Sequence, residues 1–555
     1  MALSYVLPSY LFLNSIPTLR LLRPIIKYPS AKTNKFLASS FLNTLEINKT
    51  APSTSRINIQ HPVPTSAYVH LPFCKKRCFY CDFPIVALGS GEPPPNPQGS
   101  QHDPRMENYT NLICKEIAAI GSAASDSMAP LETVFFGGGT PSLIPASLLA
   151  HIIECLRKQF GIITNSEISI EMDPGTFNAQ TLRQFMDLGI NRVSLGVQAF
   201  QESLLRSCGR SHGLKEVYEA IEIVKSSGIQ NWSLDLISSL PHQTLEDWEQ
   251  SLQQAIDAGP AHMSIYDLQV EKGTKFGLLY KPGQSPLPSE DDSAKFYRLA
   301  SRSLQEAGYG HYEISNYAKE GFQCRHNLVY WKNLPYYGFG LGATSYVGGL
   351  RLSRPRKMKD YALFVDKGYV GRGNESEVFD SKDLAMDTIM LSLRLAQGLD
   401  IRTFGKVFGL PLCLSLCRVL KPFVASGHLI VLNDDRQSLC AEVFDLFCND
   451  LRQEEIIPSK FVQQNLENKY AEVLDRDGLD VLYGVEERSV SDVRNQIAYI
   501  RLSDPEGFLL SNELISTAFA ALMLRSNFEN HGMKIIAHVN INMWITNRGQ
   551  LTAAI

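Results

Sequence analysis

The sequence predicts an α/β protein: an open partial barrel of six strand–helix units, a (β/α)6 arrangement, followed by a smaller, mainly helical C-terminal domain. Between residues 66 and 271, short runs rich in β-branched and aromatic residues alternate with amphipathic stretches. This alternation is typical of right-handed βαβ crossovers and a parallel sheet. Six units instead of eight indicate a barrel that does not close. From about residue 379 the pattern changes to helices with few strand signals.

The individual elements follow from hydrophobic periodicity and from turn residues. Strands are predicted at 67–71, 133–136, 167–171, 192–197, 232–237 and 262–268. Helices are predicted at 182–188, 214–226, 245–258 and 291–307. The Pro-, Gly- and Ser-rich segment 89–107 is predicted to be a mobile loop, because it offers little for a core. Residues 383–409 are predicted to form a helix, a turn ending in glycine and a second helix.

Composition limits the classes of function. The 555-residue chain has 44% hydrophobic and 20% charged residues and a net charge of −4. These values are ordinary for a soluble globular protein, and the missing basic excess argues against nucleic acid as a partner. No segment predicts a transmembrane helix. The eleven cysteines are mostly scattered, which favours a reducing compartment over a disulfide scaffold.

The first 60 residues differ from the rest. They hold seven Lys and Arg residues, a single acidic residue (Glu46) and many Ser, Thr and Pro residues. This balance predicts an organelle transit peptide, with a plain disordered extension as the alternative. The Met-Ala start and the length favour the chloroplast, the mitochondrion is the alternative destination, and the cytoplasm applies if the segment is not a transit peptide.

The most informative motif is the CxxxCxxC run of Cys74, Cys78 and Cys81, directly after the first predicted strand. Three thiolates at this spacing can hold three irons of a [4Fe–4S] cluster and leave the fourth iron open. The spacing alone also allows a zinc knuckle or a disulfide hairpin. A loop at the carboxyl end of a strand is, however, where α/β folds place their chemistry.

Polar or glycine residues also follow the other predicted strands. Gly137–Ser142 is a glycine-rich turn, Glu171 and Gln198 end their strands, Asp235 lies within its strand and Arg210 lies in a loop. Glycines let a backbone approach a ligand, and an arginine can bind a carboxylate through two hydrogen bonds. Taken singly, each has a structural alternative: a tight turn, a helix cap or a surface charge. Their shared position at one rim predicts a ligand site.

Together, CxxxCxxC, GGGTPS, EMDPG, RVSLGVQAF and LDLISSLPHQT resemble motifs of the radical S-adenosylmethionine (SAM) superfamily. Within it, the chain is similar to the oxygen-independent coproporphyrinogen III oxidase group, which includes the HemW-type, RSAD-like heme chaperones. The resemblance implies a radical SAM core at 61–310, an extension at 311–378 that carries the HNxxYW motif, and a HemN-type helical domain at 379–520. The transit or disordered segment 1–60 and the unassigned tail 521–555 lie outside the resemblance.

The resemblance also implies roles for residues. Cys74, Cys78 and Cys81 would ligate a [4Fe–4S] cluster, and SAM would chelate its open iron. In this family the reduced cluster donates one electron to SAM, which splits into methionine and a 5′-deoxyadenosyl radical. The positions that match cofactor-contacting positions of the family are Tyr68, Tyr80, Gly138, Gly139, Thr140, Glu171, Gln198, Arg210 and Asp235.

Two functions from different classes remain: an oxidase that decarboxylates coproporphyrinogen III, and a heme chaperone. True oxidases have a fourth cysteine two residues after the triad, where this chain has Phe83. The run RHNLVYW resembles the HNxxYW motif of heme-chaperone members, which makes His326 a candidate heme ligand and Tyr330 and Trp331 candidate porphyrin contacts. The alternative is a core histidine beside two buried aromatics. The chaperone is therefore the first prediction.

The partners implied are heme or a porphyrinogen, heme-acceptor proteins, an electron donor such as ferredoxin or flavodoxin, and a second copy of the chain in a homodimer. Whether SAM is consumed differs between the two functions, because an oxidase must use it to abstract hydrogen whereas a chaperone need not cleave it.

Overall fold

The computed structural model describes residues 62–89, 103–123, 128–368, 381–445, 447–448, 497–512, 514–516 and 518–519. The predicted transit segment and the unassigned tail therefore lie outside the described residues. In the part of the chain that is described, no helix combines the length and the apolar character needed to cross a bilayer.

A parallel sheet forms the centre of the fold, and all six predicted strands are confirmed. They are β1 (Ser66–Leu71), β4 (Leu131–Gly138), β5 (Ile162–Met172), β6 (Arg192–Gln198), β7 (Trp232–Ser238) and β8 (His262–Asp267). Each pairs in parallel with the next, in this order. Their carboxyl ends therefore meet at one edge, where a parallel fold places its ligands.

Short strands extend this sheet at both sides. β11 (Tyr337–Phe339) pairs in parallel with β1, while β10 (Asn316–Ala318) pairs antiparallel with β8 and then with β9 (Gly310–Glu313). The strand order ends at β11 on one side and at β9 on the other, and these two strands do not pair with each other. The predicted open barrel is thus confirmed.

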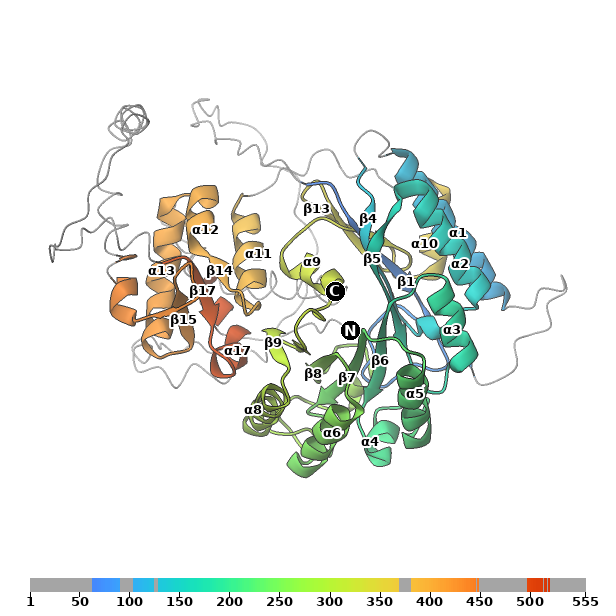
Figure 1. The fold of residues 1–555 in the computed structure, drawn as a ribbon, viewed down its shortest axis with the longest axis horizontal. Coiled ribbons are helices and arrows are strands. Elements are labelled where there is room, and N and C mark those ends of the chain that lie inside the picture. Colours follow the sequence, from blue (N-terminus) through green and yellow to red (C-terminus); the bar gives the residue numbers. More distant parts are fainter. Residues whose placement is uncertain are drawn as a thin grey trace, which may run out of the picture. The chain divides into compact units, whose positions relative to one another are not determined.

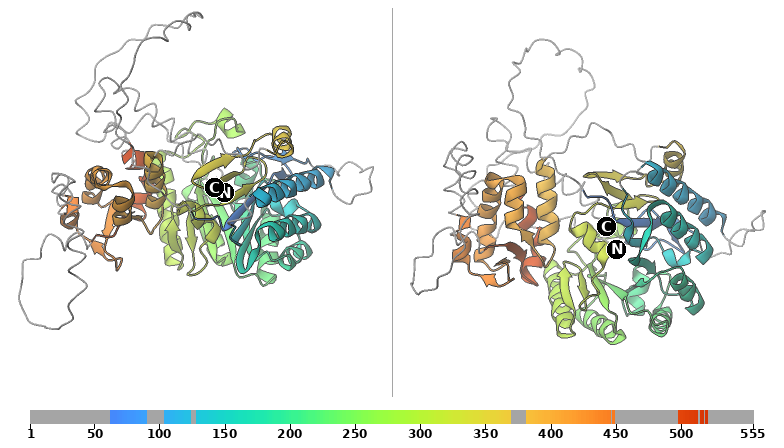
Figure 2. Two further views of the ribbon diagram at one scale, coloured as in Figure 1. Left: turned by 90° about the horizontal axis from the view of Figure 1, so that it is seen from above. Right: turned by 45° about the horizontal axis from the view of Figure 1, so that its top comes forward.

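Helices cover the outer face of the sheet (Figures 1 and 2). They are α1 (Pro104–Ala123), α2 (Ala146–Phe160), α3 (Ala179–Asp187), α4 (Glu202–Ser207), α5 (Leu214–Ser226), α6 (Leu245–Ala258) and α8 (Glu290–Glu306). Their apolar stripes and one face of the sheet form a single continuous core, with residues such as Val69, Ile113 and Leu149 fully buried.

The ends of these helices follow from local sequence. The Thr244 side chain accepts a hydrogen bond from the Asp247 amide, and the Asp247 side chain accepts one from the Thr244 amide, so that a capping box begins α6. Gly259 ends the helix in the left-handed conformation, with φ of +73°. Asn178 and Ser289 begin α3 and α8 in the same way as Thr244 does, through their side-chain oxygens.

The prediction of a loop at 89–107 is wrong for the last residues of that range. Helix α1 begins at Pro104, because proline suits the first helical position and Asp103 accepts hydrogen bonds from the amides of Arg105 and Met106. Residues 90–102 of the prediction lie outside the described residues.

Smaller elements fill the rim and the region after α8. They are β2 (Phe73–Cys74), β3 (Val86–Ala87), the 3-10 helix η3 (Pro141–Leu143), α7 (Lys275–Leu279), α9 (Arg325–Trp331), β12 (Thr344–Val347), β13 (Leu350–Ser353) and α10 (Met358–Asp366).

The C-terminal region has its own buried core. Its helices are α11 (Ser381–Leu393), α12 (Ile401–Phe408), α13 (Leu410–Ala425) and α17 (Glu506–Leu509), and the predicted helix–turn–helix is confirmed by α11 and α12. A four-stranded sheet was not predicted; its strands are β14 (Leu399–Asp400), β17 (Tyr499–Leu502), β15 (Leu429–Leu432) and β16 (Ser438–Leu439). These strands have two to four residues, too few to show a period of two.

Candidate cluster and cofactor site

The loop that carries the three cysteines is held by backbone hydrogen bonds on both sides. Cys74 ends β2, and its carbonyl accepts from the Leu88 amide at 2.8 Å. The Phe79 amide, inside the loop, donates to the Cys208 carbonyl at 2.9 Å. Arg77 closes the loop, because one of its nitrogens donates to the carbonyls of Cys81 at 3.1 Å and Phe83 at 2.9 Å. The thiols are therefore presented from a fixed backbone.

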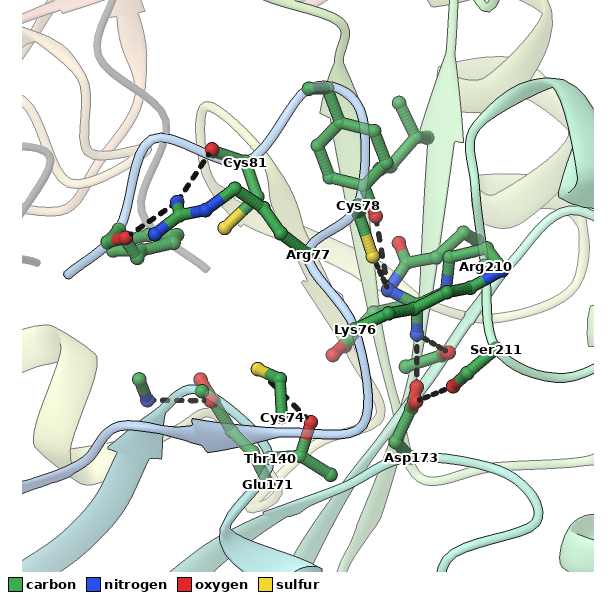
Figure 3. A pocket seen from close by; sticks show the side chains of 18 of the residues that line it. Cys74, Lys76, Arg77, Cys78, Cys81, Thr140, Glu171, Asp173, Arg210 and Ser211 are labelled. Carbon is green, nitrogen blue, oxygen red and sulfur yellow. Dashed lines mark hydrogen bonds and ion pairs between the residues drawn. The ribbon is translucent and has the colours of Figure 1, made fainter. Parts of the chain in front are cut away.

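This loop covers an open cavity of about 1160 Å³, mouth included, at the carboxyl ends of the strands. Figure 3 shows Cys74, Cys78 and Cys81 around it. The structure brings together most of the predicted site residues, and those that line the cavity are Cys74, Cys78, Cys81, Tyr80, Gly138, Gly139, Thr140, Glu171, Gln198, Arg210 and Asp235. Tyr68 and His326 are not part of this lining.

The three thiols are free and suit a soft metal centre. Thr140 Oγ1 lies 3.5 Å from the Cys74 sulfur, and Arg210 Nη1 lies 3.4 Å from the Cys78 sulfur. Burial raises the pKa of Cys74 to about 11 and that of Cys81 to about 12. These two groups are therefore protonated in the metal-free chain, and a bound metal must displace their protons.

The glycine-rich turn permits the close approach of β4 to the cysteine loop. A β-carbon at Gly139 would lie 2.6 Å from the carbonyl carbon of Pro72, and the Gly139 amide donates to the Leu71 carbonyl at 2.8 Å. Gly138 has φ of +112°, and a β-carbon there would lie 2.4 Å from the His70 ring. Only glycine fits these two positions.

Arg210 links the cysteine loop to the strand ends. It donates to the Tyr80 hydroxyl at 3.1 Å and to the Gly196 carbonyl at 3.0 Å, and it forms a buried ion pair with Asp173. Burial opposes ionisation of Asp173, but Arg210 and His212 outweigh it and keep the pKa of Asp173 below its usual value.

The role of Asp173 as the partner of Arg210 was missed by the sequence analysis, although the residue stands two positions after Glu171 in EMDPG. Ser194, Ser211 and Tyr266 also line the cavity and were not predicted. Ser194 lies in the middle of a strand, where the pattern gives no sign of a ligand site.

Three polar side chains form the floor of the cavity. Neither polar atom of the buried Gln198 amide has a hydrogen-bond partner among the described residues, and Gln198 has φ of +74°. Glu171 accepts from the Gly138 amide at 3.0 Å, and burial together with the charge of Asp235 raises the pKa of Glu171. Asp235 accepts from the Ser194 hydroxyl at 3.0 Å. An unsatisfied amide and two carboxylates fit a polar ligand with amino or hydroxyl groups.

Tyr68 lies behind this floor. Its hydroxyl bonds to His70 Nδ1 at 3.1 Å, while His70 Nε2 lies 3.0 Å from the Pro84 carbonyl and donates to it. Burial lowers the pKa of His70 to about 4, so the ring is neutral at physiological pH. Tyr68 is therefore linked through His70 to Pro84, which follows the cysteine triad.

His326 stands apart from the cavity. It lies on α9, with its ring stacked on Phe135 of β4 and 1% exposed. Its Nδ1 bonds to Thr133 Oγ1 at 2.7 Å, and its Nε2 bonds to the Tyr330 hydroxyl at 2.8 Å. Burial lowers its pKa to about 3. Both ring nitrogens are thus engaged inside the protein.

Comparison with known proteins shows to which family the chain belongs. Residues 68–255 match the family described as the Radical SAM superfamily. The heme chaperone HemW of Synechocystis is 45% identical over 338 residues, which are 60% of this chain and 79% of that protein. The chain belongs to the HemW family. In zebrafish, the mitochondrial radical S-adenosyl methionine domain-containing protein 1 is 29% identical over 61% of this chain and 74% of its own length.

A solved structure supports the fold of this HemW-family protein. Coproporphyrinogen III oxidase (HemN) of Escherichia coli, described as a radical SAM enzyme, superposes with a TM-score of 0.57 at 21% identity, over 69% of this chain and 87% of that one. Membership of the radical SAM superfamily implies a [4Fe–4S] cluster and SAM. The donor set fits both groups: three free thiols on one loop, with an unsatisfied amide and two carboxylates beside them.

Proposed function

We propose that this protein is a heme chaperone that binds heme and delivers it to acceptor proteins. The observation that carries the proposal is its membership of the HemW family, at 45% identity to a relative named heme chaperone. Phe83 adds support, because it lines the cavity and stands at the sequence position where the oxidases have a further cysteine. A phenyl ring can neither bind metal nor transfer a proton.

We further propose roles for the residues of the cavity. Cys74, Cys78 and Cys81 hold the cluster, which supplies an open iron for the amino and carboxylate groups of SAM. Glu171 and Gln198 orient the polar end of SAM. Arg210 fixes the loop around Cys78 and Tyr80 through its ion pair with Asp173.

Heme ligation by His326 is the part of the proposal that needs a conformational change. An iron can bind His326 only after α9 has left β4, because the ring is buried and both nitrogens are hydrogen-bonded. We therefore propose His326 as an axial ligand of an opened state. Tyr330 is the residue that competes with iron for Nε2.

The partners follow from the same site. Lys75, Lys76 and Arg77 line the cavity and are exposed, so that the rim beside the cysteines is basic. A basic rim suits an acidic electron donor such as a ferredoxin or a flavodoxin. The homodimer and the acceptor protein remain predictions from the family resemblance.

For location we propose an organelle. The basic, acid-poor segment 1–60 and the mitochondrial label of the zebrafish relative support organelle targeting. The chloroplast is our first choice and the mitochondrion the alternative. Fusion of residues 1–60 to a fluorescent protein in plant cells tests this choice, and a cytoplasmic signal would contradict it.

The decisive experiment separates chaperone from oxidase. Full-length protein reconstituted anaerobically with iron and sulfide is assayed in parallel for heme uptake, and for conversion of coproporphyrinogen III with SAM and a reductant. We expect one heme per chain and no protoporphyrinogen. The HemN-like fold makes the oxidase the second candidate, and product formation with methionine release would place it first.

For the heme ligand, the matched variants are His326→Ala and Tyr330→Phe. Loss of the ligand should change the heme spectrum in His326→Ala, whereas Tyr330→Phe frees Nε2 and should keep that spectrum. An unchanged spectrum in His326→Ala would exclude this ligand.

A further inference from the structure

A second group of metal-ligating side chains lies outside the cavity, where α1 and α2 meet on the outer layer of the fold. Cys114 comes from α1, and His151 and Cys155 come from α2. Their ligand atoms all lie within 4.8 Å of one another. None of the three residues lines the cavity below the cysteine loop.

The helices explain why these side chains converge. His151 and Cys155 are four residues apart on one helix and therefore share a face. α1 and α2 lie side by side (Figures 1 and 2). The Cys114 sulfur lies 3.9 Å from the His151 carbonyl, and the free thiols of Cys114 and Cys155 lie next to each other. The convergence thus comes from two well-packed helices and not from a loop.

The donor set selects the kind of ion. Two sulfurs and one imidazole nitrogen are the ligands of borderline-soft ions such as Zn²⁺, and oxygen-seeking ions such as Mg²⁺ are disfavoured. Cys114 is buried, Cys155 is half-buried and His151 is exposed. The group is therefore open to solvent on the histidine side, which leaves room for water as a fourth ligand.

We propose that Cys114, His151 and Cys155 form a zinc-class metal site that joins α1 to α2. Binding of one Zn²⁺ replaces the two thiol protons, which are released to solvent, and the neutral imidazole donates its lone pair. Because both thiols must lose their protons, affinity for the ion rises with pH. The site is independent of the cluster and of heme.

The first test measures metal in the full-length protein. After reconstitution of the cluster, exposure to Zn²⁺ and dialysis against a mild chelator, we expect one zinc per chain by elemental analysis. Cys155→Ser and His151→Ala should each lose that zinc and keep their iron, while Cys440→Ser, which changes an exposed thiol, should keep both. Equal zinc in all variants would overturn the proposal.

The second test removes the competing soft site. In the full-length Cys74→Ser, Cys78→Ser, Cys81→Ser background, Co²⁺ should give tetrahedral ligand-field bands and thiolate charge-transfer absorption at one equivalent. Cys155→Ser and His151→Ala should each weaken binding at least tenfold. Absorption bands that survive these changes would show that cobalt binds other thiols, such as buried Cys413 and Cys417, and would overturn the proposal. A disulfide between Cys114 and Cys155 in anaerobically prepared protein would also overturn it.

Discussion

At the residue scale, His326 shows how a motif match and a structure give different information. The match to HNxxYW indicates a heme ligand, but the structure places the ring between β4 and α9 with both nitrogens bonded. The bond to Thr133 and the stacking on Phe135 hold α9 against the sheet, while the bond to Tyr330 lies within α9. In the conformation described, the histidine therefore stabilises the fold.

This geometry predicts a large loss of stability in His326→Ala. The change leaves a cavity and leaves the Thr133 and Tyr330 hydroxyls without a partner, so we expect the free energy of unfolding to fall by about 2–4 kcal/mol. Urea unfolding of the metal-free chain under reducing conditions measures it. A loss below about 0.5 kcal/mol would show that α9 does not depend on this ring.

Arg210 provides a second prediction for one residue. Arg210→Lys keeps the charge beside Asp173 but cannot contact Cys78, Tyr80 and Asp173 at once. We expect normal iron content, a changed paramagnetic signal of the reduced cluster and at least tenfold weaker SAM binding. Arg206→Lys is the control, because Arg206 pairs with Glu202 at the surface. Identical signals in the two variants would contradict this role of Arg210.

At the scale of elements, the site depends on how closely β4 approaches the cysteine loop. Gly139→Ala would force a β-carbon against the Pro72 backbone, which cannot move without shifting β2 and Cys74. We expect this variant to fold with reduced iron and to lose SAM binding, as measured by iron analysis and equilibrium dialysis. Gly310→Ala is the matched control, because its β-carbon meets its first neighbour at 3.6 Å. Full SAM binding by Gly139→Ala would mean that the loop tolerates the displacement.

The sequence predicts those features that depend on residues close together in the chain. The six parallel strands were found because each contains a buried run, and the rim residues were found because they lie in or near the ends of those strands and in motifs that resemble a known family. The ion pair of Asp173 with Arg210 joins positions 37 residues apart and has no local sign. The same is true of the C-terminal sheet, where β17 pairs with β15 and β14 across long stretches of chain. The packing of His326 likewise depends on β4, which is remote in the sequence.

At the scale of the whole molecule, buried histidines and a buried glutamate make the free energy of unfolding change with pH in opposite directions. Burial lowers the pKa of His70 to about 4 and of His326 to about 3, and it raises the pKa of Glu313 to about 8. Unfolded histidines bind protons below about pH 6.5 and the folded ones do not, so stability rises with pH up to that value. Between the pKa of this glutamate in the unfolded chain and about pH 8, Glu313 is protonated in the folded state and ionised in the unfolded state. The free energy of unfolding therefore falls as the pH rises through this range.

These opposite slopes predict that the free energy of unfolding is greatest at about pH 6.5. Above it, the buried Glu313 accounts for a fall of about 2 kcal/mol up to pH 8. Glu313 accepts from the Ser315 amide at 3.0 Å and from Asn316, and a glutamine can keep one of these bonds without carrying a charge. Glu313→Gln should therefore flatten the alkaline side and make the rise on the acid side steeper, because the falling contribution of Glu313 is removed from both, as measured by urea unfolding at several pH values. A parallel fall in both proteins would show that Glu313 does not hold a proton in the folded chain, and that the alkaline loss of stability arises in other groups.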